Sequence, residues 1–289
     1  MNNHMVGVVP IVTKPMDFNM DWHDCLMPIA PNYYAIERAV LECAYAGCKT
    51  IWIVANDDAT PLIRHRLGDY IQDPIWLRRQ CKFPSNKRTL IPIFYVPCPP
   101  EHKNKEYCIS WTILRGASVA SRVGGSISKW LKPTSFYVAF PYSVYPPEFL
   151  RQHRILLAKE EGFFLKFKKQ SVGTGNFLGF TFNFKQFESM RDKFYKIEDS
   201  LLLGEELENE KEYFRDKFSL DNIFKCAILI EQDGFEIPWF YQIDSWDSYC
   251  DFLSSEEKSE LRHPGKLVIS YRELNPIGVD NANQSNQDN

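Results

Sequence analysis

Short apolar runs alternate with stretches of helical apolar spacing through the first half of the chain. Residues 6–13 and 50–55 are β-branched or fully apolar runs, typical of buried strands. Residues 32–46 carry apolar side chains at helical spacing and are followed by a glycine, which often ends a helix. A proline opens a second predicted helix over residues 61–70. This order of strand, helix, strand and helix predicts a parallel sheet with right-handed crossovers.

The same alternation continues to about residue 140. Strands are predicted at residues 91–96 and 136–140, with a long helix at 110–123 between them. Pro10 lies inside the first apolar run and is expected to mark the point where that strand stops pairing. The predicted fold class is therefore α/β, a Rossmann-like, mostly parallel sheet with helices on both faces.

The second half adds further strands to this arrangement. Strands are expected at residues 162–168, 176–184, 227–232 and 239–243, with a turn at residues 233–234. Residues 218–224 and 245–253 are predicted short helices, and the acidic residues 200–217 a solvated helix or loop. We expect one domain over residues 1–275, followed by a disordered polar tail at 276–289.

Composition and charge narrow the class of protein. The 289 residues are 44% hydrophobic and 25% charged, which excludes a disordered or fibrous chain. A net charge of −3 gives no general attraction to nucleic acid or to an acidic membrane, and no apolar run approaches the roughly 20 residues of a membrane span. The N-terminus lacks signal-peptide features, and the eight scattered cysteines contain no C-x-x-C pair. We expect a cytoplasmic protein with buried thiols, and neither membrane nor nucleic acid as a partner.

Several segments follow one another in the order of a known family. The family has a first strand of the type G-V-I-L-A-A, a K-P-L-L-P segment, a helix ending in A-G, an I-x-I-V strand and a helix ending in G-D. Here the corresponding segments are GVVPIV at 7–12, CLMPI at 25–29, a predicted helix ending in AG at 46–47, TIWIV at 50–54 and LGDY at 67–70. Over residues 6–255 the series resembles the sugar-nucleotide pyrophosphorylases, nucleotidyltransferases that join a sugar phosphate to a nucleoside triphosphate.

The resemblance implies a fold, a ligand and a cofactor. The fold is that of the nucleotide-diphospho-sugar transferases, the partner a nucleotide or nucleotide-sugar, and the cofactor Mg²⁺. Residues 136–142 resemble the strand that carries the family's first metal aspartate. Residues 239–253, WFYQIDSWDSYCDFL, resemble the late segment W-x-D-I-G-T-x-x-D-Y. Asp244 is the counterpart of the second metal carboxylate.

The sequence departs from the family where charge matters most. The family's G-x-G-T-R loop holds the triphosphate through glycine N–H groups and an arginine, but residues 13–23 contain neither residue type. The family's lysine falls near Asp24 or Cys25, and its first metal aspartate near Tyr142. Phosphoryl transfer needs such charges, so the resemblance implies a site that is rebuilt or degenerate.

Three residues of the first loop are the catalytic candidates. Lys14 follows the first predicted strand, where parallel sheets place ligand sites, and is a candidate phosphate contact. His23 and Asp24 are candidates for acid–base chemistry or for lining the pocket. The structural alternatives are a solvated lysine and a turn capped by the acidic and histidine side chains.

Nucleotide-binding candidates follow three predicted strands. They are Val12 and Thr13 after the first strand, Asn56 and Asp57 after the second, and Tyr142 and Ser143 after the fourth. The alternative for the second pair is helix capping, and for the third pair aromatic packing at a strand end. Helix capping is also the alternative role of Asp244.

Three functions fit this pattern. The first is a nucleotidyltransferase-like protein acting on a nucleotide or nucleotide-sugar. The second is a non-catalytic binding or assembly module that keeps the fold. The third is a glycosyltransferase with a nucleotide-sugar donor, which ranks lower because no D-x-D follows the fourth strand. The residues do not separate a sugar phosphate, choline phosphate or a nucleotide alone as the substrate.

Overall fold

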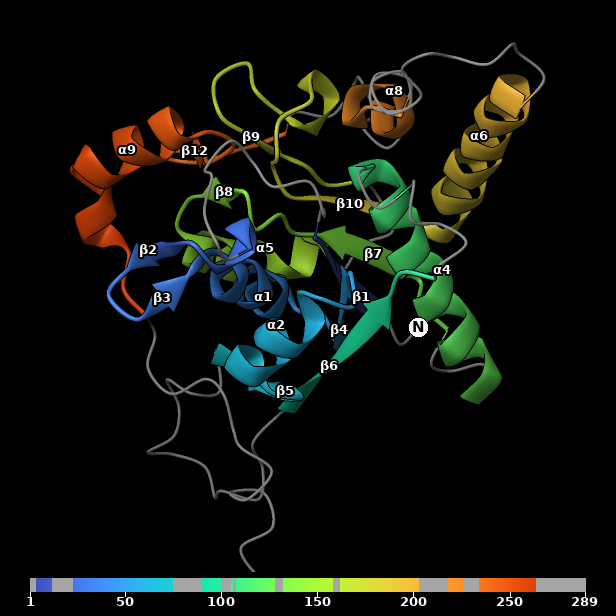
Figure 1. Cartoon of the computed structure of the whole chain (residues 1–289), viewed down its shortest axis with the longest axis horizontal. Coiled ribbons are helices and arrows are strands. Elements are labelled where there is room, and N and C mark those ends of the chain that lie inside the picture. Colours follow the sequence, from blue (N-terminus) through green and yellow to red (C-terminus); the bar gives the residue numbers. More distant parts are fainter. Residues whose placement is uncertain are drawn as a thin grey trace, which may run out of the picture.

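A six-stranded sheet forms the centre of the chain in a computed structural model (Figure 1). The structure describes residues 4–11, 23–74, 90–99, 105, 108–127, 132–157, 162–202, 218–225 and 234–263. The strand order is β10-β7-β1-β4-β6-β5, in which β7, β1, β4 and β6 are parallel and the outer strands β10 and β5 are antiparallel to their neighbours. The strands are β1 (Met5–Pro10), β4 (Thr50–Ala55), β5 (Tyr70–Gln72), β6 (Leu90–Pro97), β7 (Ser135–Val138) and β10 (Phe180–Asn183).

Helices cover both faces of the sheet, so the predicted α/β fold is confirmed (Figure 1). Consecutive strand residues point to opposite faces, and in β1 Val9 belongs to one apolar core and Val8 to the other. The Val9 face packs against α1 (Ala35–Ala46), α2 (Thr60–Leu67), α5 (Leu150–Leu157) and α9 (Trp246–Ser254). The Val8 face packs against α4 (Ile109–Ile127), α6 (Phe184–Leu202) and α8 (Leu220–Phe224).

Short elements complete the described chain. The strands form three two-stranded pairs: β2 (Pro28–Ala30) with β3 (Tyr33–Tyr34), β8 (Ser143–Val144) with β12 (Tyr241–Gln242), and β9 (Leu165–Lys166) with β11 (Phe235–Glu236). The 3-10 turns are η1 (Asp24–Leu26), η6 (Pro147–Phe149), η7 (Val172–Thr174) and η9 (Glu257–Glu260).

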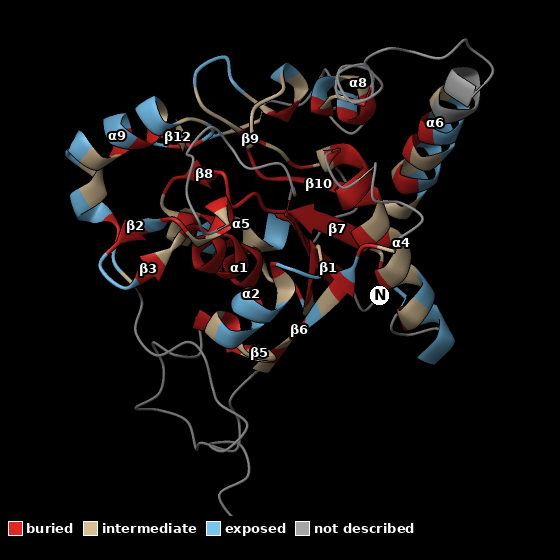
Figure 2. Cartoon of the chain, viewed as in Figure 1, coloured by how far each residue is buried: buried red, intermediate tan, exposed pale blue. Residues whose placement is uncertain are grey.

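Helix α1 is buried along its whole length (Figure 2). The sheet lies on one side of it, and η6, α5 and β8 cover the other. Gly47 ends the helix with φ +99°, a left-handed conformation that glycine adopts without strain. Charged residues of α1 therefore lie in the interior, where each needs a partner.

Several sequence predictions need correction in the second half and at the sheet edge. The helix predicted over 61–70 ends at Leu67, because Gly68 breaks it and Tyr70 already belongs to the antiparallel strand β5. Helices α5 and α6 were not predicted, and the strands expected at 162–168 and 239–243 shorten to the two-residue β9 and β12. The strand predicted at 227–232 and the tail at 276–289 lie outside the described residues.

Six cysteines in the described part of the chain are free thiols. Five of them are buried, as predicted, whereas Cys250 on α9 is exposed. In the same described ranges, no helix combines the length and apolar character that a bilayer crossing requires.

Candidate functional site at the carboxyl edge of the sheet

The carboxyl ends of the four parallel strands form the edge where the sequence places its candidate residues. Open parallel sheets bind ligands outside these strand ends. Strand β1 ends at Pro10, and the N–H of Ile11 still donates to the carbonyl of Val54 at 2.9 Å. Val12, Thr13 and Lys14, the predicted residues that come next, lie outside the described residues. Their roles stay predictions.

His23 and Asp24 lie at the start of η1, which leads into β2, β3 and then α1. The Nδ1 atom of His23 accepts a hydrogen bond from the N–H of Cys25 at 3.3 Å, and the Asp24 side chain is buried. The turn is fixed to the beginning of α1, because the Ala35 N–H donates to the Met27 carbonyl at 3.0 Å. The His23 imidazole therefore caps this turn, which was the structural alternative to acid–base chemistry.

Asn56 and Asp57 follow β4 at the same edge. The Asn56 side-chain oxygen accepts from the N–H of Ala59 at 2.9 Å, and its carbonyl accepts from the N–H and hydroxyl of Thr60. These bonds satisfy donors at the start of α2. Asp57 is exposed. Asn56 thus caps α2, while the Asp57 carboxylate lies in solvent beside the strand end.

The capping role gives a stability prediction. Asn56→Ala is expected to lower the free energy of unfolding by about 1 kcal/mol, because the Ala59 N–H loses its acceptor. Asn56→Asp keeps a capping oxygen and is expected to retain most of that stability. Urea denaturation measures both variants. Asp57→Ala, on the exposed neighbour, is the matched control and is expected to change stability by less than about 0.5 kcal/mol. Equal losses in Asn56→Ala and Asp57→Ala would contradict the capping role.

The structure brings Tyr142, Ser143 and Asp244 together. Gln242 pairs with Ser143 in the β8–β12 ladder, and the N–H of Ile243 donates to the carbonyl of Tyr142 at 2.8 Å. Asp244 is exposed and accepts a hydrogen bond from Gln242 Nε2 at 2.6 Å. The two positions that match the family's metal carboxylates are thus neighbours in space, although they lie about a hundred residues apart in sequence.

Aromatic side chains pack together directly after the end of β7. Tyr142 is buried, and its ring centroid lies 5.8 Å from that of Phe177. The Phe140 ring lies 5.4 Å from the same Phe177. The Gln242 side-chain oxygen accepts from the Phe177 N–H at 3.1 Å, which ties this cluster to β12. Tyr142 therefore shows the aromatic packing at a strand end that was the alternative to nucleotide binding.

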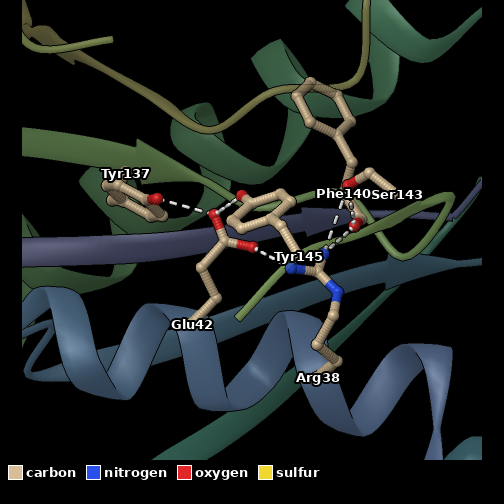
Figure 3. A network of polar contacts seen from close by, with 6 residues as sticks. All are labelled: Arg38, Glu42, Tyr137, Phe140, Ser143 and Tyr145. Carbon is tan, nitrogen blue, oxygen red and sulfur yellow. Dashed lines mark hydrogen bonds and ion pairs between the residues drawn. The ribbon is translucent and has the colours of Figure 1, made fainter. Parts of the chain in front are cut away.

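A buried polar network lies beneath this strand end (Figure 3). Arg38 and Glu42, one turn apart on α1, form an ion pair at 2.8 Å with both side chains fully buried. Glu42 also accepts hydrogen bonds from the hydroxyls of Tyr137, at 2.6 Å, and Tyr145. Arg38 donates to the Phe140 carbonyl and to the Ser143 hydroxyl. The network thus fixes the chain between β7 and β8 onto α1.

Burial sets the protonation of this network. Burial raises the pKa of Glu42, while the Arg38 charge and the two tyrosine hydroxyls act in the opposite direction. Burial, followed by the Glu42 charge, raises the pKa of Tyr137 and Tyr145 well above the ordinary value. Gly179 passes close to this group, because a β-carbon there would overlap with the Tyr137 hydroxyl and with Glu42 Oε1. The Ser143 side chain is fully buried, and its hydroxyl accepts a hydrogen bond from Arg38, so this predicted site residue has a structural partner.

Arg38 and Glu42 were not singled out from the sequence. The available signal was a pair of opposite charges four residues apart within a predicted helix whose remaining positions are mostly apolar. Such a pair is usually solvated, so the spacing alone does not identify a buried network.

Two further features bear on ligand binding: groups of side chains that could hold a metal ion, and basic side chains that could contact phosphate. Within the described residues, no group of three or more histidine, cysteine or acidic side chains is placed to hold a metal ion. Arg64 and Arg66, the two arginines of α2, form ion pairs with Asp69 and Glu37, each at 2.9 Å.

Known proteins match the chain in structure and not in sequence. No protein-family model matches it, and no curated protein does. A putative glucose-1-phosphate thymidylyltransferase from Bacillus anthracis, in complex with a sucrose, superposes with a TM-score of 0.55 at 9% identity, covering 90% of this chain and 97% of that one. UTP-bound UGPase from Acinetobacter baumannii gives 0.52 at 10% identity, covering 86% and 92%.

A UDP-glucose pyrophosphorylase complexed with UDP-glucose gives a TM-score of 0.51 at 12% identity, covering 89% of this chain and 99% of that one. These identities are low, so the likeness is one of fold. The three matches span most of both chains, in agreement with the order of segments found in the sequence. This chain therefore has the mixed α/β fold of the sugar-nucleotide pyrophosphorylases.

Proposed function

We propose that the chain is a nucleotidyltransferase-like protein that binds a nucleotide or nucleotide-sugar at the carboxyl edge of its sheet, in a rebuilt site. The observation that carries the proposal is the β8–β12 ladder, which holds Asp244 beside the end of β7. The fold shared with structures bound to UTP and UDP-glucose supports the class of ligand.

The exposed carboxylate of Asp244 at this edge suits a cation that binds together with the nucleotide. Mg²⁺ is commonly held by one or two carboxylates together with substrate phosphates. Asp244, with its exposed carboxylate, fits the role of the single protein ligand, and Tyr142 takes the place of a second one. When bound, Mg²⁺ would neutralise phosphate charge. Lys14 would contact phosphate, and His23 and Asp24 would line the approach to the pocket.

The proposal is tested by thermal shift against nucleoside triphosphates and nucleotide-sugars, with and without Mg²⁺. A ligand present at a hundred times its Kd adds about 2.7 kcal/mol of stability, which raises the Tm of a chain of this length by several degrees. We expect such a shift for at least one nucleotide, and we expect it to depend on Mg²⁺.

Matched variants locate the binding. Lys14→Ala and Asp244→Asn are expected to lose the shift or its dependence on Mg²⁺. Lys49→Ala, directly before β4 on the opposite edge, and Asp251→Asn, an exposed residue of α9, are expected to keep it. A flat response across the panel, or equal losses in the control variants, would overturn the proposal.

A second function is favoured by the packed aromatic cluster. Tyr142 and Phe177 fill the position that follows β7, which suits a binding or assembly module without phosphoryl chemistry. Nucleotide binding that is independent of Mg²⁺, with no release of pyrophosphate or nucleoside monophosphate, would support this function over transfer.

A further inference from the structure

A small cavity lies between α4 and α6. Both helices cover the sheet face opposite α1 (Figure 1). One wall is formed by Trp111, Arg115 and their neighbours on one stripe of α4, at positions three, four and seven apart. The other wall is formed by Arg191, Phe194 and Tyr195, again at helical spacing on α6. Two facing helix stripes therefore build the cavity, and neither belongs to the carboxyl edge of the sheet.

The lining is cationic and aromatic. Lys105, Arg115 and Arg191 supply the charge, and among the described residues no acidic side chain belongs to the lining. Arg191 has a counter-charge in Asp192, whose carboxylate lies 3.5 Å from the guanidinium. Both of those side chains are more than 40% exposed, so the pair neutralises little of the charge. The described lining thus carries a net positive charge.

Arg115 has an unused donor inside the protein. Its Nε atom is buried and has no hydrogen-bond partner among the described residues. A buried N–H without an acceptor is costly, and an oxygen atom that reaches it removes that cost. Arginine presents its donors in a planar fork that matches the oxygens of phosphate and carboxylate groups.

The cavity is large enough for a small anion. Its free volume is about 90 Å³, which has room for several water molecules. One tetrahedral oxyanion therefore fits inside it. Trp111 and Phe194 are buried at the walls, and a less hydrated setting strengthens the attraction between the cations and an anion.

We propose that the cavity between α4 and α6 is a binding site for a phosphate group, supplied as inorganic phosphate or as the end of a small phosphate monoester, with Arg115 and Arg191 as its main ligands. The site is separate from the nucleotide site proposed above and does not depend on it. Tyr195, a residue that is 54% exposed, lies at the mouth, where the remainder of a monoester would emerge.

Calorimetric titration of the full chain with inorganic phosphate tests the site, with chloride at equal ionic strength as the reference. A parallel titration with glycerol 3-phosphate separates the two sources, since tighter binding of that ester identifies a monoester ligand. Arg115→Met keeps the apolar stem and removes the fork, so we expect phosphate affinity to fall about tenfold to a hundredfold. Arg191→Met, at a more exposed position, is expected to weaken binding as well and serves if the first variant does not fold.

Two control variants decide the location. Arg122→Met removes an exposed cation of α4 outside the cavity lining and is expected to leave phosphate affinity unchanged. Lys14→Ala is also expected to leave it unchanged. Binding that is lost in Lys14→Ala and kept in Arg115→Met and Arg191→Met would place the phosphate elsewhere and overturn the inference. So would affinity no greater than that for chloride.

Discussion

Glu42→Ala is expected to lower the free energy of unfolding by about 3–5 kcal/mol, the largest single-residue loss we anticipate. The change leaves the fully buried Arg38 guanidinium without its counter-charge. It also removes the acceptor of the Tyr137 and Tyr145 hydroxyls. Urea denaturation followed by circular dichroism measures the loss.

A paired variant separates the charge effect from simple loss of packing. Arg38→Met with Glu42→Gln removes both charges but keeps a side-chain oxygen for the two tyrosine hydroxyls. Because replacing both members of a buried pair is often close to neutral, we expect it to recover most of the loss. The exposed pair of Arg64 and Asp69 is the control, and Arg64→Ala is expected to cost about 1 kcal/mol or less. A Glu42→Ala loss no larger than that of Arg64→Ala would contradict this account.

High pH is expected to destabilise the fold steeply through three buried tyrosines. Burial raises the pKa of Tyr33, Tyr137 and Tyr145 well above the ordinary value of about 10. Above that pH the unfolded chain releases the three protons and the folded chain keeps them. The unfolded state then binds fewer protons, so stability falls as pH rises. At about 1.4 kcal/mol for each group, the three contribute a loss of about 4 kcal/mol per pH unit.

Tyrosinate absorbance and denaturation at several alkaline pH values measure this effect. Tyr137→Phe removes one of these groups, so the slope is expected to become shallower by about 1.4 kcal/mol per pH unit, and Tyr195→Phe, on an exposed side chain, is the matched control. If all three tyrosines ionised near their ordinary pKa with the fold intact, the proposed burial of their hydroxyls would be wrong.

The sheet was predictable because its signals are local. The runs at β1, β4 and β6 are apolar and bounded by turn residues, so β4 and β6 were placed within one residue at each end, whereas the first predicted strand continued beyond Pro10, where β1 ends. Helix α6 also carried a signal, since Phe187, Met190 and Phe194 recur at helical spacing and are all buried. The Phe-rich strand before it was extended to residue 184, where the helix begins, and the helix was not predicted.

The candidate site was harder to predict because it depends on partners far along the chain. Asn56 follows β4 whether it binds a ligand or caps a helix, and only the bond to Ala59 identifies the cap. Glu37, Arg38 and Glu42 would usually mark a solvated face of α1. Instead Glu37 pairs with Arg66 of α2, and the other two bond to β7 and to the chain that follows it. The neighbourhood of Tyr142 and Asp244 was implied by the family resemblance, and the β8–β12 ladder supplies the contact.

Strand β6 bears on self-association. It pairs with the three-residue β5 over Leu90–Pro92, while residues 93–97 pair with β4 on the other side. An outer strand edge is a template to which another molecule can add a strand, and aggregation begins in this way. The N–H of Ile93 points to this outer side, where it donates to the carbonyl of Asp69, so the backbone nitrogens of residues 95 and 97 point there as well. Pro97 has no N–H to donate, so a strand added along this edge would lack one hydrogen bond at that position.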